Sequence, residues 1–237
     1  MKKWIEKWFG TKSEDDLNSE NMTITQSKDI DYAQKQVEDF STFEDEIEVI
    51  IVSDNHEAKE GLASILEEHP DADHYFHCGD SNLDSSMDIM QRFITVKGNT
   101  DYTFDYKDKE RLALASGDYV LVTHGHLYSV NRGTRGLVEM ENFSMFEAMY
   151  RKQKPAKTTI IMYGHTHIVD VKMEEKVLVI NPGSVALPRG GSSTRTYARL
   201  VITPAFYDVE IKNARDHSIV QTFQFPRELH QLDQAQG

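Results

Sequence analysis

The sequence contains a single cysteine, Cys78, among 237 residues. An internal disulfide is therefore excluded, and the fold must depend on a hydrophobic core, which a chain of this length is able to bury. A lone cysteine suits a reducing compartment, so we predict a cytoplasmic protein. Cys78 follows an apolar run, which favours a small buried thiol, because a nucleophilic thiol would need a base beside it.

Long hydrophobic runs are absent as well. No stretch reaches the roughly 20 apolar residues that a membrane-spanning helix needs, and the first residues lack the apolar segment of a signal peptide. We therefore expect no transmembrane segment and no secretion signal.

Positive charge is scarce. Lys and Arg number 26 against 39 Asp and Glu, which leaves a formal net charge of −13. Such a surface repels the phosphate backbone of nucleic acids, so we expect no extended nucleic-acid footprint. A small phosphate ester held directly by metal ions remains compatible, since the ions are then the dominant local charges.

Residues 1–46 differ in composition from the rest of the chain. Residues 1–10 hold both tryptophans on one side of a short predicted helix, with lysines around them. Residues 11–30 are polar and acidic, as in a flexible tether. We predict an acidic, partly flexible N-terminal extension whose first helix docks loosely or binds a membrane surface or a partner groove. A third interpretation is an early start codon, with Met22 as the internal candidate.

Residues 47–225 show a regular pattern that predicts one domain. An apolar run at 49–52 and a helical pattern at 58–68 are followed by short strand patterns near 75–76 and 93–96. The continuous apolar run is typical of a strand buried on both faces. This β-α-β alternation predicts a largely parallel sheet with right-handed crossovers.

Hairpin patterns dominate the second half of this domain. Ser116-Gly117-Asp118 marks the turn of one predicted hairpin and Glu174-Glu175 the turn of another, and paired strands continue to about residue 223. A long helical pattern covers about 137–151. We expect two sheets packed face to face with helices outside, followed by a polar C-terminal tail at 226–237.

Five polar clusters each come directly after an apolar run that reads as a strand. The carboxyl ends of strands are where α/β folds usually build their sites. Carboxylates, amides and imidazoles are ligands for divalent metals. One such cluster occurs often by chance, but five in a fixed order favour a two-metal hydrolase. The clusters are Ser53-Asp54-Asn55-His56, Cys78-Gly79-Asp80, Lys97-Gly98-Asn99-Thr100-Asp101, Thr123-His124-Gly125-His126 and Tyr163-Gly164-His165-Thr166-His167.

Two of the clusters contain a pair of potential ligands two residues apart. Alternation along an extended segment puts residues i and i+2 on the same side. We therefore expect Asp54 and His56 to bind one ion together, with Asn55 pointing away. The same geometry predicts that His165 and His167 both face the cleft.

Asp80 is the natural bridge between two ions, because a carboxylate has two oxygens and Gly79 lets the backbone turn before it. Asn99 offers a neutral oxygen and His124 another imidazole. His77 faces away from Asp80 on an extended strand, so we assign it a structural role.

The motifs D-x-H, G-D, G-N-x-D, H-G and G-H-x-H resemble the calcineurin-like metallophosphoesterases, over about residues 47–225. Within that superfamily the chain is similar to the YfcE-like bacterial and archaeal phosphodiesterases, also in Asn181-Pro182-Gly183-Ser184. The resemblance implies an α/β fold, a four-layer α/β/β/α sandwich of two mixed sheets flanked by helices. It also implies two divalent metal ions, Mn first, with Ni, Zn or Fe as alternatives. Carried over residue by residue, one ion is bound by Asp54, His56, Asp80 and His167, and the second by Asp80, Asn99, His124 and His165.

The implied mechanism is attack on phosphorus by a hydroxide that bridges the metals. Many superfamily members place a histidine directly after the metal-binding Asn, where this chain has Thr100. The leaving group then needs another proton donor or must itself be a good one. We take His126 as the candidate catalytic acid or phosphate contact, and expect Asp101 to orient its neighbours.

Ser184 and Arg189 are further candidates to line the cleft, and Arg189 is the candidate substrate-binding residue that holds a phosphate oxygen. Gly190 and Gly191 beside it also fit a mobile loop with a solvated arginine.

We conclude from the sequence that the chain is a metal-dependent phosphoesterase, and favour a phosphodiesterase acting on a small ester. The alternatives are a phosphomonoesterase or a nuclease of the same fold, or a non-catalytic protein-binding scaffold like a retromer subunit of similar fold. The complete ligand set weighs against the scaffold. A homo-oligomer is compatible with the sequence, which does not specify the natural substrate.

Overall fold

The computed structural model describes residues 45–102, 106–128, 137–138 and 158–227. Residues 1–44 of the predicted N-terminal extension, nearly all of the long helical pattern at 137–151 and the tail after residue 227 lie outside the described residues. Among the described helices, none has the length and apolar character needed to cross a bilayer.

The first sheet combines a parallel half with an antiparallel half. Its strand order is β11-β10-β9-β1-β2-β3, in which β1, β2 and β3 are parallel and the other three strands are antiparallel to their neighbours. Helix α3 connects β1 to β2, as the alternating pattern predicts, and a 3₁₀ turn, η3, precedes β3. The bounds are β1 Ile47–Val52, α3 Lys59–Glu68, β2 His74–His77, η3 Met90–Arg92, β3 Ile94–Thr95, β9 Thr196–Ile202, β10 Phe206–Asn213 and β11 Ile219–Pro226.

The second sheet is also mixed, with the order β4-β5-β6-β8-β7. Strands β5, β6 and β8 are parallel, while the predicted hairpins β4–β5 and β7–β8 are both confirmed. Glu175 and Lys176 turn the second hairpin with φ of 51° and 69°. The bounds are β4 Lys109–Ala113, β5 Tyr119–Thr123, η4 His126–Tyr128, β6 Ile160–Met162, β7 Val169–Glu174 and β8 Val177–Pro182.

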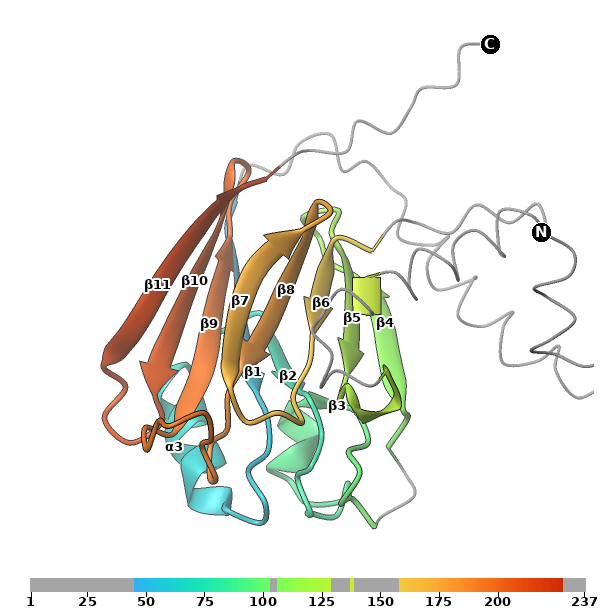
Figure 1. Cartoon of the computed structure of the whole chain (residues 1–237), viewed down its shortest axis with the longest axis vertical. Coiled ribbons are helices and arrows are strands. Elements are labelled where there is room, and N and C mark those ends of the chain that lie inside the picture. The colour runs from blue at the N-terminus through green and yellow to red at the C-terminus, as the bar shows by residue number, and fades with distance from the viewer. Residues whose placement is uncertain (1–44, 103–105, 129–136, 139–157, 228–237) are drawn as a thin grey trace, which may run out of the picture. The chain divides into compact units, whose positions relative to one another are not determined.

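The two sheets pack face to face, and alternate residues of the central strands enter different cores (Figure 1). Val49 and Ile51 of β1 lie in the core between the sheets, whereas Ile50 and Val52 lie in the core under α3. On the outer face of the second sheet, Leu137 belongs to the cluster that covers β5, β6 and β8. The expected fold of two mixed sheets packed face to face is therefore confirmed, and α3 covers the outer face of the first sheet.

A buried ion pair links the two sheets at the amino-terminal end of β5. Asp118 Oδ2 lies 3.0 Å from the Arg227 guanidinium, and both side chains are nearly inaccessible to solvent. The other oxygen, Oδ1, accepts hydrogen bonds from the Tyr207 hydroxyl at 2.6 Å and the Thr159 hydroxyl at 2.8 Å. The Asp118 carboxylate therefore connects the β4–β5 hairpin to β10 and to the chain segment after β11.

Candidate metal centre

The five polar clusters lie at the carboxyl ends of β1, β2, β3, β5 and β6. Within each sheet these strands run parallel, so each sheet presents its clusters along one edge. Hydrogen bonds between clusters of different sheets show that the two edges meet: the His165 amide donates to Asp54 Oδ2 at 3.1 Å, and His124 Nδ1 donates to the Cys78 carbonyl at 2.8 Å.

The first group of converging side chains comprises Asp54, His56, Asp80 and His167, each with one potential ligand atom within 4.8 Å of the others. His56 Nε2 and His167 Nε2 are 3.5 Å apart, and His167 Nε2 lies 3.2 Å from Asp54 Oδ1. Yet Asp54 Oδ1 is fully buried and accepts no aligned hydrogen bond from the described residues. Two ring nitrogens and an orphaned carboxylate oxygen aimed at one point fit a cation.

The second group comprises Asn99, His124 and His165, and it borders the first at Asp80. His124 Nε2 lies 3.4 Å from Asp80 Oδ2 and 3.1 Å from Asn99 Oδ1. His165 Nδ1 lies 2.9 Å from the same Asn99 oxygen. The structure thus brings all seven predicted ligand residues together, with Asp80 at the junction of the two groups.

The outward-facing ring nitrogens of the first group have fixed hydrogen-bond partners. His167 Nδ1 donates to the Leu187 carbonyl at 2.6 Å, and His56 Nδ1 donates to Asn82 Oδ1 at 3.0 Å. The Asn82 amide is itself oriented, because its Nδ2 donates to the Thr100 carbonyl. Since each Nδ1 carries the proton, each Nε2 keeps a free lone pair directed at the centre, as metal-binding histidines require.

Asp101 connects the loop that follows β2 to the loop that follows β3, and both loops carry candidate ligands. Its buried carboxylate accepts hydrogen bonds from the backbone amides of Asp80 at 2.8 Å, Asn82 at 2.7 Å and Gly98 at 2.7 Å. The Ser81 hydroxyl adds a fourth at 3.2 Å. These contacts agree with the expectation that Asp101 orients its neighbours.

The backbone of the candidate ligands is left-handed, so the prediction that they lie on extended segments is wrong. In both pairs the residues at i and i+2 have positive φ, a conformation that costs energy for residues other than glycine and occurs often at functional sites. The φ angles are 55° for Asp54, 42° for His56, 54° for Asp80, 68° for His165 and 59° for His167.

Two glycines allow the loops to approach closely. A Cβ at Gly164 would lie 1.9 Å from Ser53 Oγ and 2.8 Å from Asp54 Oδ2. A Cβ at Gly98 would lie 2.1 Å from Asp80 Oδ1. A side chain at either position would therefore push a candidate carboxylate ligand out of place.

Electrostatics keep the central carboxylate charged. Burial alone raises the pKa of Asp80, but the hydrogen bond and charge of His124, together with the Thr100 amide, lower it well below its usual range. Burial lowers the pKa of His77 to about 4, so this ring is neutral, and it contacts Asn55 Oδ1 at 2.7 Å. That contact agrees with a structural role for His77, and it directs the buried Asn55 side chain toward His77, as expected for a residue that points away from the ion.

Cys78 is fully buried, as predicted, and burial raises the pKa of its thiol well above the ordinary value, which excludes a reactive thiolate. Its carbonyl orients the His124 ring.

Among the remaining candidates, Ser184 does not line the cleft. It is completely buried, and its hydroxyl donates to the Asp54 carbonyl at 2.8 Å, so it supports a candidate ligand from behind. Arg189 is exposed, and its amide donates to the His167 carbonyl at 3.1 Å. The His126 ring centre lies 5.4 Å from that of His124 and 6.2 Å from that of His165, and its buried Nδ1 has no hydrogen-bond partner among the described residues.

Asn82 is the supporting residue that sequence reasoning missed, and it offers a direct test. The Asn82→Gly variant removes the acceptor for His56 Nδ1 but tolerates the native φ of 54°. We expect a 10- to 100-fold loss of affinity for Mn²⁺, a typical effect for a partner of a metal ligand, measured by calorimetry. Asn82→Asp retains an acceptor oxygen and should recover most of the affinity. Equal affinity in the wild type and Asn82→Gly would contradict this role.

The comparisons with known proteins agree with this geometry. Residues 47–204 match the calcineurin-like phosphoesterase superfamily domain. The chain is 35% identical over 166 residues to the probable metallophosphoesterase YsnB of Bacillus subtilis, covering 68% of this chain and 90% of YsnB.

Solved structures show the same fold. A Streptococcus pneumoniae TIGR4 protein described as a predicted phosphoesterase matches with a TM-score of 0.65 and 26% identity, over 77% of this chain and 99% of that one. Vacuolar protein sorting 29 of Cryptosporidium parvum matches with a TM-score of 0.58 at 14% identity, over 77% of this chain and 99% of that one, which shows the fold alone. From the domain match and the identity to YsnB, the chain belongs to the calcineurin-like phosphoesterase superfamily of metal-dependent phosphoester hydrolases.

Proposed function

We propose that this protein hydrolyses a small phosphodiester at a centre of two divalent metal ions. The observation that carries the proposal is the pair of ligand groups that share Asp80, with Asp54 Oδ1 orphaned in the first. In this proposal Mn²⁺ is the leading metal, and Ni, Zn and Fe are alternatives. One ion is held by Asp54, His56, Asp80 and His167, and the other by Asp80, Asn99, His124 and His165.

The charge of the ligand set favours an anionic substrate. Only Asp54 and Asp80 are carboxylates, so they supply two negative charges against the four positive charges of two divalent ions. The remaining ligands are neutral imidazoles and an amide. The occupied centre therefore keeps a net positive charge that attracts a phosphoryl group. When bound, the ions would supply a hydroxide nucleophile at neutral pH and neutralise charge on the phosphoryl oxygens.

The contacts of Thr100 favour a diester with a good leaving group. Its amide donates to Asp80 Oδ1 at 2.8 Å and its hydroxyl to Asn82 Oδ1 at 3.2 Å, so it positions ligands and has no proton to deliver at neutral pH. We assign proton delivery to His126, whose ring lies beside those of His124 and His165. A partly exposed imidazole is suited to this role.

The test is hydrolysis of bis-p-nitrophenyl phosphate by the metal-stripped protein, with Mn²⁺, Ni²⁺, Zn²⁺, Fe²⁺ or Mg²⁺ added back. We expect turnover to return with metal and to exceed that of p-nitrophenyl phosphate by at least about tenfold. His126→Asn should bind metal normally and lower kcat by about 10²-fold for a diester with an alkoxide leaving group, but change kcat little for bis-p-nitrophenyl phosphate, whose p-nitrophenolate leaves without a proton. Faster turnover of the monoester would contradict the diester assignment, and metal-independent turnover would contradict the metal centre.

A further inference from the structure

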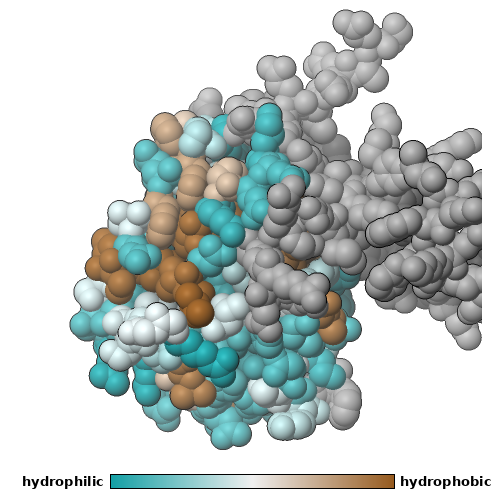
Figure 2. Space-filling model, in the orientation of Figure 1, coloured by the Kyte–Doolittle hydropathy of each residue, from teal (hydrophilic) through white to brown (hydrophobic). Residues whose placement is uncertain are grey.

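A small cavity lies next to the metal centre, between the edge strands β7 and β11 of the two sheets. Its volume is about 210 Å³, and the loop around Arg189 and Gly190 forms its third side. Figure 2 shows apolar side chains gathered on the face over these strands. The cavity is smaller than the roughly 300–1,000 Å³ of pockets that hold drug-sized ligands, and suits a group of about the size of a sugar.

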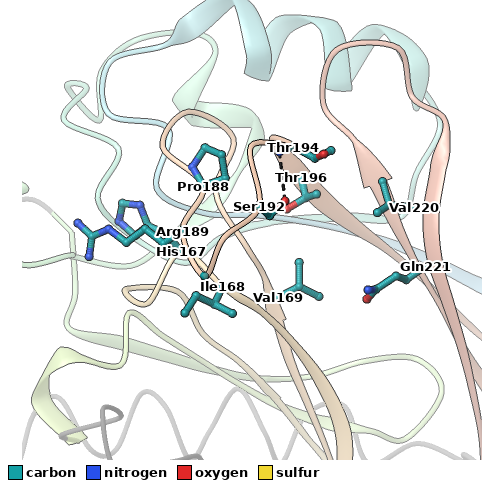
Figure 3. Close-up of a pocket in the computed structure, with 11 residues that line it drawn as sticks. His167, Ile168, Val169, Pro188, Arg189, Ser192, Thr194, Thr196, Val220 and Gln221 are labelled. Carbon is teal, nitrogen blue, oxygen red and sulfur yellow. Dashed lines mark hydrogen bonds between the residues drawn. The ribbon is translucent and has the colours of Figure 1, made fainter.

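The cavity shares one residue with the candidate ligand set. His167 lines it, and Arg189 lies beside His167, with its amide bonded to the His167 carbonyl at 3.1 Å. Figure 3 shows His167 and Arg189 at one end of the lining residues, and Val220 and Gln221 at the other. A group bound here would therefore extend away from the metal centre along β11.

The walls combine aliphatic surface with neutral polar groups. Val169 and Val220 supply the aliphatic part. The Thr194 hydroxyl and the Gln221 amide make no hydrogen bond within the described residues, so both are available to a ligand. Apart from His167 and Arg189 at the one end, none of the described lining residues is ionisable. Such walls favour a neutral, hydroxyl-bearing group over a charged or purely apolar one.

Arg189 lies at the end of the cavity that is next to the candidate metal centre. Its side chain is exposed and has no carboxylate partner in the described part of the chain. Figure 3 shows its guanidinium directed away from Val220 and Gln221, on the side of His167. A free guanidinium at this place can hold a phosphoryl oxygen of a substrate whose substituent fills the cavity.

We infer that this cavity binds one of the two substituents of the phosphodiester and selects a neutral, sugar-like one. The inference rests on the proposed phosphodiesterase function and narrows its substrate class. A phosphate at the metal centre would carry its leaving group outward and its second substituent between β7 and β11. Esters with a sugar on the phosphate should therefore be better substrates than esters with a minimal alkyl group.

The test compares two diesters that share a leaving group, thymidine 5′-(p-nitrophenyl phosphate) and methyl p-nitrophenyl phosphate. For the wild type with Mn²⁺ we expect kcat/KM to be about tenfold higher for the thymidine ester. Val220→Trp fills the cavity and should reduce this ratio to about one, and Thr194→Val should reduce it about threefold. Ile219→Trp is the matched control, because Ile219 precedes Val220 on β11 and does not line the cavity.

The outcomes separate the inference from the proposed function. Equal kcat/KM for the two esters in the wild type, or an unchanged ratio in Val220→Trp, overturns the inference and leaves the phosphodiesterase standing. If Ile219→Trp also lowers the ratio of the two kcat/KM values to about one, the inference is overturned, because the effect would then not come from the cavity. Failure of the metal-loaded wild type to hydrolyse either ester overturns the proposed function and the inference with it.

Discussion

The Asp80→Asn variant is expected to lose on the order of 10³-fold or more in kcat/KM for bis-p-nitrophenyl phosphate, and to retain less metal after dialysis. Asparagine preserves the size of the side chain and an oxygen that accepts from the Thr100 amide, at 2.8 Å in the native protein. What it removes is the negative charge at the junction of the two ligand groups. Metal content by elemental analysis and steady-state kinetics measure the two effects separately.

Asp84→Asn is the matched control for this substitution. Asp84 lies four residues further along the chain and is exposed, and its carboxylate bonds only to Ser86 among the described residues. The same chemical change there should leave metal content and kcat/KM within about twofold of the wild type. Full metal content and activity in Asp80→Asn would show that Asp80 does not bridge the two groups.

The Asp118→Ala variant is expected to lower the free energy of unfolding by about 3–5 kcal/mol, because the buried Arg227 guanidinium loses the Asp118 carboxylate. The Tyr207 and Thr159 hydroxyls would also lose their hydrogen bonds to this carboxylate. This is the largest effect on stability that we expect from a residue outside the candidate metal centre. Equilibrium unfolding in urea, with the m value checked for constancy, measures it.

Asp208→Ala provides the comparison for Asp118→Ala. Asp208 lies next to Tyr207 on β10, and its carboxylate accepts from Gln224 in an exposed position. Its removal should change the free energy of unfolding by no more than about 0.5 kcal/mol. Double replacement of Asp118 and Arg227 by apolar residues should recover part of the loss, since no unpaired charge remains. A loss below about 1 kcal/mol in Asp118→Ala would mean that the ion pair does not hold the sheets together.

The central strands and the identity of the candidate ligands could be predicted from the sequence because both depend on local patterns. The apolar run from Val49 to Val52 indicates burial on both faces, and the structure distributes these residues between two cores. The Asp54 and His56 side chains converge as expected, although their backbone is left-handed and not extended. The spacing of the residues in the sequence indicated which side chains converge. No sequence pattern, however, indicates positive φ at non-glycine residues, so the backbone conformation could not be predicted.

The supporting contacts could not be predicted, because they join residues far apart in the chain. Asn82 contacts His56 across 26 positions, and Ser184 contacts the Asp54 carbonyl across 130. Asn82 has no composition or spacing that distinguishes it from an ordinary loop residue, and Ser184 was predicted to line the cleft, whereas it supports Asp54 from behind. The same holds for the cavity, whose lining comes from β7, β9, β11 and the loop around Arg189, segments that lie far apart in the chain.

The proposed ligands come from both sheets: Asp54, Asp80 and Asn99 follow strands of the first, whereas His124 and His167 follow strands of the second. Metal occupancy and the association of the sheets are then thermodynamically linked, since an unfolded chain offers no comparable site. Free metal at 100 times its dissociation constant would add about 2.7 kcal/mol to the free energy of unfolding. Starvation for metal would thus lower the abundance of the folded protein as well as its turnover, so the supply of the ion would set how much enzyme persists.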